Sequence, residues 1–336
     1  MRKKILALTL SLAFAFSLCT TSTFAENGKV STDDQIYENH YQANLKDIDV
    51  QLYGKDEIKV SDKKSKKKSF ITNDLSISSE TNDTSDYSTD LKNLHKVLKN
   101  EKFKKYFSEM VKSNKTPIAI GVAEAEVLIT LDENGKEISS RPMTNKEVKE
   151  ENEGIATASA TNGQTQTRDT LSLYTSVVDK GSGTYWVQSN AYWSGGEYST
   201  GNEAIAITWE SAFGANNNSE STISYVLDGT GDVTTSTASM QDFEAYKGVA
   251  WSIPDGYYFW GDYIYRLRGA YAGCSVTRTS GSAARHYFTS EYIHTYSSVA
   301  FTASIETDAT KLTSATLTLT PTPTSWKLVS YIQGTF

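Results

Sequence analysis

The sequence predicts a mainly β protein whose C-terminal half is an antiparallel β-sandwich or barrel. From about residue 169 onward, runs of alternating apolar and polar residues follow one another, each bounded by turn residues such as Gly, Asn and Asp. All six Trp residues lie in this half, and large rings dominate the energetics of a core. Strands that alternate with helices, as in dinucleotide-binding folds, are absent from the pattern. We therefore expect roughly eight to ten antiparallel strands there, preceded by a small α+β unit and a poorly ordered N-terminal region.

The first 25 residues have the layout of a secretory signal peptide. A basic start at residues 2–4 precedes an apolar run over residues 5–18, and Thr23-Phe24-Ala25 fits a small-x-small cleavage site. The run is too short to be read first as a spanning helix, so we expect no transmembrane anchor. These features predict a secreted or extracellular protein, released or retained without a covalent bond at the cell surface.

Cysteine usage and charge narrow the class further. Loss of residues 1–25 removes Cys19, and the remaining thiol, Cys274, has no partner for an intramolecular disulfide. The same cleavage removes three basic residues and changes the net charge from −7 to −10. A strongly negative chain has no general affinity for nucleic acid, and we expect no nucleic-acid partner.

Residues 26–87 are predicted to be disordered or weakly ordered. They are rich in charged and hydroxyl residues and hold few large apolar groups, so burial does not offset their ordering entropy. Short apolar alternations at residues 50–52 and 58–60 offer only weak pairing. The Lys-rich run Lys63–Ser69 is interpreted as a solvated linker. The alternatives are contact with an anionic cell-wall polymer or membrane face, and proteolytic processing.

Residues 88–143 are predicted to form a small helix-plus-hairpin unit. Leu91, Leu94 and Leu98 recur at helix spacing within 88–112, with a phase slip near Asn100. We expect the apolar stripe of this helix to dock on its own domain; a basic amphipathic helix on a membrane is the alternative.

A hairpin is predicted at residues 117–142, with its turn at Asn134-Gly135. Asp132-x-Asn134 lacks the further ligands of a calcium loop, so it is interpreted as turn chemistry. Residues 144–168 are polar and are predicted to be a linker to the β domain at 169–336.

The richest aromatic stretch runs from Trp251 to Cys274. A hairpin closed by Gly261-Asp262 would pair Trp260 with Tyr263 and Tyr258 with Tyr265, whereas an unbroken strand would alternate these rings between faces. We favour the hairpin because Gly is disfavoured inside a strand. The rings are interpreted first as core and rim of a sandwich, and alternatively as a platform for stacking sugar rings or a peptide. The candidate ligand-binding residues are Trp186, Tyr258, Trp260 and Tyr263.

Strong catalytic signatures are absent from the sequence. It holds no H-E-x-x-H, no G-x-S-x-G, no phosphate-binding loop and no paired C-x-x-C. The remaining possible actors are interpreted as sheet histidines and a small buried Cys, without a zinc site. They are His286, Glu291, His294 and Cys274.

Four further acidic residues are candidates for hydrolysis or ion binding. Glu210 and Asp262 are the acids nearest to aromatic residues, and paired carboxylates for glycoside hydrolysis meet only in the fold. Asp228 and Asp232 flank a Gly-rich segment that is interpreted as a turn, with a Ca²⁺ loop as the alternative. We expect no catalytic residue, no metal and no cofactor.

These observations predict a secreted, non-enzymatic binding or surface-interaction protein that contacts carbohydrate or cell-wall polymer through an aromatic face. One alternative is a β-type pore-forming or membrane-active toxin, because the Ser/Thr-rich alternation at residues 284–306 is typical of amphipathic strands. The other is an extracellular hydrolase that uses Glu210, Asp262 or Cys274. The order of leader, helix, hairpin and Ser/Thr/aromatic β domain resembles secreted proteins of Gram-positive bacteria, a likeness of composition that implies no activity.

Overall fold

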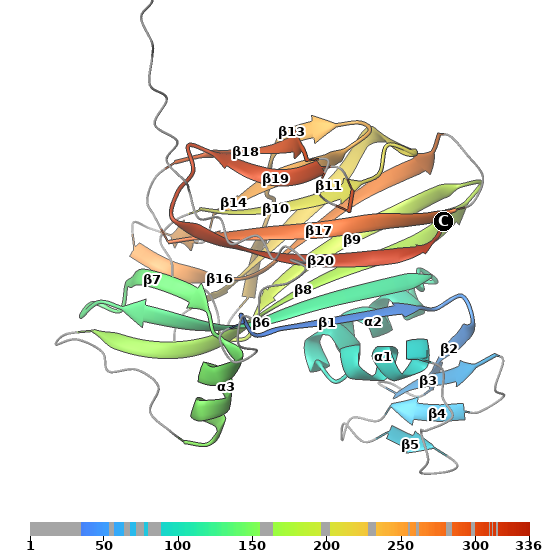
Figure 1. Ribbon diagram of the computed structural model, residues 1–336, viewed down its shortest axis with the longest axis horizontal. Coiled ribbons are helices and arrows are strands. Elements are labelled where there is room, and N and C mark those ends of the chain that lie inside the picture. Colours follow the sequence, from blue (N-terminus) through green and yellow to red (C-terminus); the bar gives the residue numbers. More distant parts are fainter. Residues whose placement is uncertain are drawn as a thin grey trace, which may run out of the picture.

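The structure is a computed structural model. Two antiparallel sheets packed face to face form the centre of the protein (Figure 1). The structure describes residues 35–53, 57–63, 68–71, 77–79, 89–154, 164–195, 202–227, 233–254, 256–259, 262–279, 284–296, 300–308, 310, 312–313 and 315–336.

The large sheet carries the outer surface on which the site lies. Its central path runs β1-β6-β8-β9-β16-β11-β12, all antiparallel. The bounds are β1 (Glu38–Asn44), β6 (Ala119–Leu131), β8 (Thr165–Gly181), β9 (Thr184–Trp193), β16 (Asp262–Arg278), β11 (Phe213–Leu227) and β12 (Val233–Ser236). Off this path, β7 (Glu137–Pro142) pairs with β6, and β15 (Gly256–Phe259) pairs with the start of β16.

The small sheet closes the core from the other side. Its strands are β13 (Ser239–Glu244), β14 (Gly248–Pro254), β10 (Asn202–Trp209), β17 (Arg285–Thr295) and β20 (Ser325–Thr335), in that order. The inner faces of both sheets contribute large rings that are almost fully buried, among them Trp193, Trp209, Trp251, Phe213 and Phe288. The period-two alternation therefore has the predicted consequence: apolar side chains point inward and a sandwich results.

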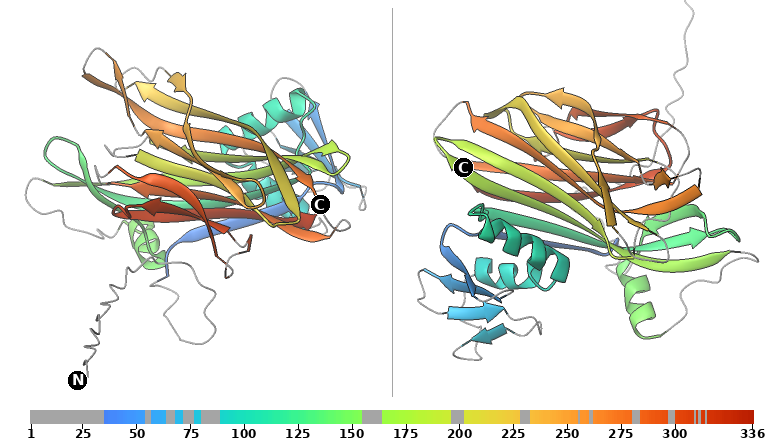
Figure 2. Two further views of the ribbon diagram at one scale, coloured as in Figure 1. Left: turned by 90° about the horizontal axis from the view of Figure 1, so that it is seen from above. Right: turned by 180° about the vertical axis from the view of Figure 1, so that it is seen from behind.

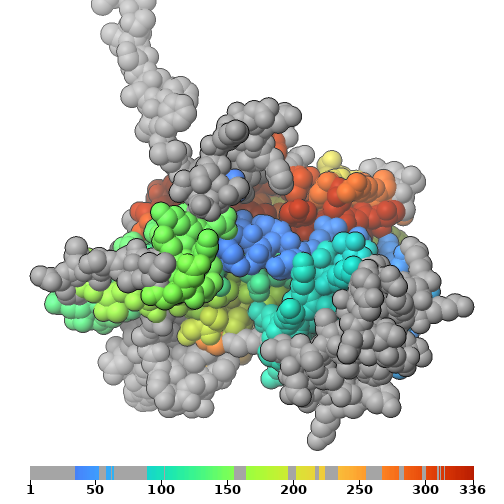
Figure 3. All heavy atoms as spheres, turned by 60° about the horizontal axis from the view of Figure 1, so that its bottom comes forward, coloured from blue at the N-terminus to red at the C-terminus, as the bar shows by residue number. Residues whose placement is uncertain are grey.

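Each sheet is covered on its outer face as well. The hairpin of β18 (Thr302–Thr307) and β19 (Ala315–Thr320) places Ile305 and Leu317 against Ala206 of β10. On the large sheet lie α1 (Thr89–Val97) and α2 (Glu101–Lys112), beside β1 (Figure 3).

The helical layer confirms the predicted amphipathic stripe. The chain leaves the helix between α1 and α2, at the phase slip near Asn100. The apolar stripe docks on the chain's own sheet, where Phe103 stacks on Tyr174 of β8 with ring centroids 4.3 Å apart.

Residues 38–79 contain more strand than the sequence predicted. Besides β1, they form a sheet of β2 (Ile48–Tyr53), β3 (Glu57–Asp62), β4 (Lys68–Ile71) and β5 (Ile77–Ser79) beside the helices (Figure 2). The two short apolar alternations pair with each other, Val50 with Val60. Burial against α1 and α2 supplies the free energy that the segment lacks by itself. Within the Lys-rich run, positions 64–67 lie outside the described residues.

The polar segment at 144–168 contains a helix that was not predicted, α3 (Asn145–Asn152). Thr144 and Glu147 form a capping box, in which Glu147 accepts the backbone N–H of Thr144 at 2.9 Å. β6 precedes this segment in the sequence, and β8 begins within it. The two strands pair along Ala119–Leu131 of β6, so the large sheet contains residues from both sides of the segment. The proposed domain boundaries at 87/88, 143/144 and 168/169 stay predictions.

The hairpin predicted at 117–142 is confirmed as β6 and β7. Asp132 Oδ1 accepts the backbone N–H groups of Asn134 and Lys136, each at 2.9 Å, and Gly135 has a φ of 76°. The Asp-x-Asn pattern is therefore used for a turn. Among the described helices, none is long and apolar enough to cross a membrane.

The two sheets come closest where β20 crosses β6. A Cβ atom on Gly121 would lie 2.1 Å from the backbone oxygen of Tyr331. Nearby, the side-chain amide of Gln42 donates to the backbone oxygen of Gln333 at 2.7 Å and accepts its N–H at 2.8 Å. This amide occupies hydrogen-bonding groups of the β20 edge that a further strand would otherwise use.

We predict that Gly121→Ala lowers the free energy of unfolding by about 3 kcal/mol, because the added methyl group meets a backbone atom that cannot move aside. Urea unfolding followed by circular dichroism measures the change. The control is Gly135→Asn, in an open turn where Asn tolerates positive φ, and it should cost less than about 0.5 kcal/mol. Equal stability of Gly121→Ala and the unmodified chain would show that the crossing is not close-packed.

We predict that acid weakens the helical layer through His95. Burial in α1, reinforced by Lys99, lowers the pKa of His95 to about 4. The unfolded chain takes up the proton near pH 6.5 and the folded chain only near pH 4, so the unfolding free energy falls as pH drops through this window. His95→Gln should remove on the order of 2 kcal/mol of the loss between pH 7 and 4.5. Urea titrations at both pH values test this, with His40→Gln, at an exposed position of β1, as the control.

Candidate binding cleft

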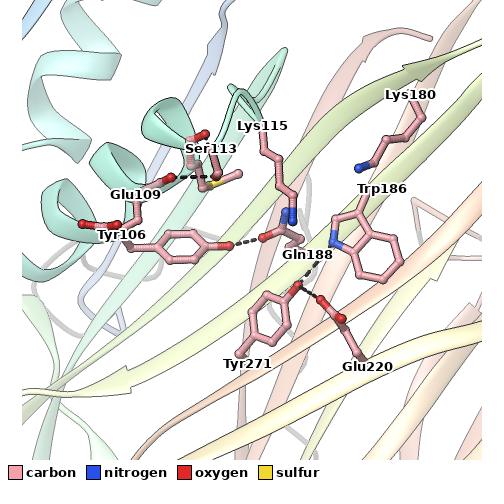
Figure 4. A pocket seen from close by; sticks show the side chains of 10 residues that line it. Tyr106, Glu109, Ser113, Lys115, Lys180, Trp186, Gln188, Glu220 and Tyr271 are labelled. Carbon is pink, nitrogen blue, oxygen red and sulfur yellow. Dashed lines mark hydrogen bonds between the residues drawn. The ribbon is translucent and has the colours of Figure 1, made fainter. Parts of the chain in front are cut away.

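A cleft of about 440 Å³ opens between α2 and the outer face of the large sheet (Figure 4). Its walls come from segments far apart in the sequence: α2 and the turn after it, then β8, β9, β11 and β16. The lining residues are Tyr106, Glu109, Met110, Ser113, Lys115, Lys180, Trp186, Gln188, Glu220 and Tyr271.

The strand register decides which side chains reach the cleft. Trp186 and Gln188 are two residues apart on β9 and therefore point to the same face. Gln188 is paired with Gly273 of β16, and Gly273 is paired with Glu220 of β11. Paired residues share a face, so one outward row of these strands forms the floor of the cleft.

Gly273 makes room for the aromatic rings above it. A Cβ atom at this position would lie 2.5 Å from Cζ2 of Trp186 and 2.8 Å from the hydroxyl oxygen of Tyr271. The absence of a side chain lets the Trp186 ring lie against the β16 backbone. Trp186 remains partly exposed in this position and lines the cleft.

A chain of hydrogen bonds holds the two rings in place. Trp186 Nε1 donates to the Tyr271 hydroxyl at 3.2 Å, and that hydroxyl donates to Glu220 Oε1 at 2.7 Å. Burial, together with the hydrogen bond to Glu220, raises the pKa of Tyr271 well above its ordinary value. The hydroxyl therefore stays protonated, and the orientation of both rings is maintained across the physiological pH range.

The helical wall is tied to the floor by Tyr106. Its hydroxyl donates to Gln188 Oε1 on β9, and burial raises the pKa of Tyr106 to about 12. This contact connects α2 to the sheet beside Trp186. The hydrogen bond therefore holds the helical wall of the cleft against its floor.

The structure brings only one of the predicted ligand-binding residues to this cleft, namely Trp186. Tyr258 and Tyr263 lie at the paired ends of β15 and β16, and their side chains lie outside the described part of the structure, as does Trp260. Their assignment to a binding face stays a prediction.

The favoured hairpin is confirmed, but its predicted register was wrong. Tyr258 pairs with Tyr263 and Phe259 with Asp262, so the connection is Trp260-Gly261 and not Gly261-Asp262. The register of β16 is set along its length by pairing with β9 and β11, and a bulge next to Tyr258 takes up the mismatch. Pairing with these two strands therefore outweighs the conformational preference of the turn residues.

The residues that the sequence offered for catalysis or ion binding have contacts in different parts of the structure. Cys274 is fully buried in the core, and burial raises the pKa of its thiol to about 12. His286 Nδ1 lies 2.8 Å from Glu210 Oε2. Glu291 forms an ion pair with Lys327 at 2.6 Å. Asp228 and Asp232 lie outside the described residues.

His294 stands between two carboxylates at the end of the sandwich. Its Nε2 lies 3.0 Å from Glu137 Oε1 and its Nδ1 lies 3.0 Å from Glu203 Oε1, with all three side chains inaccessible to solvent. The two nitrogens face different carboxylates, so the donors do not converge on one point. Within the described residues, no group of His, Cys, Asp and Glu is arranged to hold a metal ion. The triad instead connects β7, β10 and β17.

Sequence reasoning did not identify the polar residues of the cleft, such as Gln188 and Glu220. The alternation in TYWVQSNAYW already placed Gln188 on the same face as Trp186. The contributions of Tyr106, Lys115 and Lys180 have no local signal, since these residues meet the others only through packing.

Comparison with known proteins gives little guidance. No protein-family model matches the chain, and no curated protein is similar to it in sequence. Among solved structures, the collagen-binding domain from a Staphylococcus aureus adhesin is similar at a TM-score of 0.26 and 8% identity, over 45% of this chain and 90% of that one. The collagen-binding domain of Erysipelothrix rhusiopathiae surface protein RspB gives 0.25 and 7%, over 62% and 79%. A pore forming protein gives 0.24 and 8%, over 63% and 92%, and similarity at these levels carries no conclusion about this chain.

We predict that Cys274 is unreactive in the folded protein, because a buried thiol of raised pKa presents almost no thiolate. In protein lacking residues 1–25, an aromatic disulfide reagent at pH 8 should label no thiol in native buffer and one thiol per chain in denaturant. Cys274→Ser serves as the control and should show no labelling in either condition. Rapid labelling of the native protein would place Cys274 at an accessible site.

Proposed function

We propose that this chain is a non-enzymatic extracellular binding protein that takes a sugar ring of a glycan or cell-wall polymer into the cleft, against Trp186. The observation that carries the proposal is the seating of Trp186 on Gly273, partly exposed and oriented by Tyr271. The apolar face of a sugar ring stacks on an indole, and the hydroxyl groups of the sugar need polar partners around it.

The surroundings of Trp186 meet this second requirement. Gln188 lies on the same strand as Trp186, Glu220 lies on β11 beyond β16, and Ser113 lines the helical wall. Amide, carboxylate and hydroxyl groups accept and donate hydrogen bonds in the directions that sugar hydroxyls offer. The network from Trp186 to Glu220 is already formed, so little ordering entropy is lost on binding.

Two of the three groups named for hydrolysis, Glu210 and Cys274, have other contacts, and the side chain of Asp262 lies outside the described part of the structure. Glu210 accepts the backbone N–H of Tyr287 at 3.1 Å besides its contact with His286, and Cys274 lies in the core. A carboxylate pair that flanks a sugar bond is a property of glycosidases. The cleft has two carboxylates, and both are engaged: Glu220 by the Tyr271 hydroxyl at 2.7 Å and Glu109 by Lys112 Nζ at 3.1 Å. We therefore propose binding without turnover.

The toxin alternative rests on residues 284–306, about half of which belong to β17. This strand lies between β10 and β20, and nearly all of its residues are buried. Insertion into a membrane would require β17 to leave the middle of the small sheet. Extracellular location rests on the leader at residues 1–25, which lie outside the described residues.

We predict that Trp186→Ala weakens binding to an insoluble polysaccharide that retains the unmodified chain by about tenfold or more. Co-sedimentation with cellulose, chitin and purified peptidoglycan measures the bound fraction. Loss of a stacked ring is worth about 1.4 kcal/mol or more, which is tenfold in affinity. Trp186→Phe should retain part of the binding.

The matched control is Tyr246→Ala, which removes a ring that is 57% exposed and does not line the cleft. Its binding should be unchanged. The proposal fails if none of the three polymers retains the chain, or if Trp186→Ala binds as well as the control.

A further inference from the structure

The charged side chains of the cleft differ in whether they already have partners. Both acids are engaged: Glu220 accepts the Tyr271 hydroxyl at 2.7 Å, and Glu109 lies 3.1 Å from Lys112 Nζ. Lys115 and Lys180 also line the cleft, and both are exposed. In the part of the chain that the structure describes, neither of these two ammonium groups makes an ion pair.

The two lysines come from different elements, the turn after α2 and strand β8, and both line the cleft. Figure 4 shows their amino groups next to Gln188 and Trp186, on the opposite side from Glu220. The chain as a whole is negative, with a net charge of −7, so an anion is not attracted by the molecule in general. A local pair of cations next to an aromatic ring is therefore a specific feature of this cleft.

The backbone holds both lysines in defined places. Lys115 follows α2, where its N–H donates to Met110 O at 2.8 Å and Asn114 has a φ of 55°. Lys180 precedes a tight turn in which Gly181, Ser182 and Gly183 have positive φ. Asp179, the acid beside Lys180, uses its Oδ1 to accept the N–H of Gly181 at 2.7 Å and so fixes the turn.

We infer that the cleft selects an anionic sugar: a ring that stacks on Trp186 and carries, or adjoins, a phosphate or carboxylate group that Lys115 and Lys180 bind. The inference rests on the proposed function, because the sugar ring occupies the same position. Two ammonium groups offer six N–H donors to the oxygens of one anion, and charge-assisted hydrogen bonds are stronger than neutral ones. Anionic cell-wall polymers and uronic-acid glycans both present this chemistry.

The experiment compares a hexose, the corresponding hexose 6-phosphate, the corresponding hexuronate and inorganic phosphate, with affinity measured by calorimetry on the full chain. We expect at least one of the two anionic sugars to bind about 30-fold more tightly than the hexose and than inorganic phosphate. Comparison of the hexose 6-phosphate with the hexuronate shows whether the bound group is a phosphate or a carboxylate. Raising the salt concentration from 50 to 500 mM should reduce the preference, because exposed charges are screened.

The variant Lys115→Gln/Lys180→Gln should lose this preference about tenfold or more and retain the weak binding of the neutral hexose. The matched control is Lys136→Gln/Lys146→Gln, which makes the same change in net charge at exposed positions in the β6–β7 turn and α3. Its affinities should be unchanged. Urea unfolding of both double variants identifies a merely structural role, in which Lys115 only stabilises the end of α2.

The outcomes separate the two proposals. If the hexose and both anionic sugars bind with equal affinity, and Trp186→Ala loses this binding, the anion selectivity is overturned but the proposed sugar site is supported. Tight binding of inorganic phosphate alone, or anion binding unaffected by Trp186→Ala, shows an anion site without a sugar. Loss of stability in Lys115→Gln/Lys180→Gln with unchanged selectivity assigns the lysines to the fold. Absence of binding in all four arms overturns both proposals.

Discussion

The close crossing of β20 over β6 is the contact on which the arrangement of the layers depends. Gly121 brings the backbones together, and inside the core the hydroxyl of Thr175 on β8 donates to that of Ser330 on β20 at 2.9 Å. Because the sandwich is joined here through its inner faces, the outer face of the large sheet is left to the helices. Buried aromatic side chains contribute large apolar areas to the core, and the missing side chain of Gly121 permits the close approach of the two sheets.

The cleft is a consequence of incomplete coverage of that outer face. α1 and α2 bury Ile120 and Val122 of β6. Beyond Tyr174, the described contacts of the helical layer with β9 include the Tyr106 hydrogen bond and the packing of Tyr192. On the strands that the helices leave uncovered, the rings of Trp186 and Tyr271 lie over Gly273. A glycine in the middle of a strand weakens that strand. At Gly273, however, the missing side chain leaves room for the rings of both Trp186 and Tyr271.

Local patterns predicted the features that depend on neighbours in the sequence. The alternation of β8 and β9, the turn at Asn134-Gly135 and the break near Asn100 all follow from spacing. The sequence also contained the signal for α3, since Thr144 and Glu147 have capping-box spacing, but polarity led to the interpretation as a linker. The hairpin register at Tyr258 was wrong because ladders with distant strands outweigh the preference of a turn.

By itself, the sequence determined that the C-terminal half consists of strands with one apolar face and that the aromatic residues make its core, because these properties follow from side-chain period and size. Only the tertiary structure decided what meets across the layers. His294 lies between Glu137 and Glu203, and Lys115 and Lys180 line one cleft, although long stretches of chain separate these residues. No local pattern encodes such pairs, since each depends on how two sheets and a helical layer pack together.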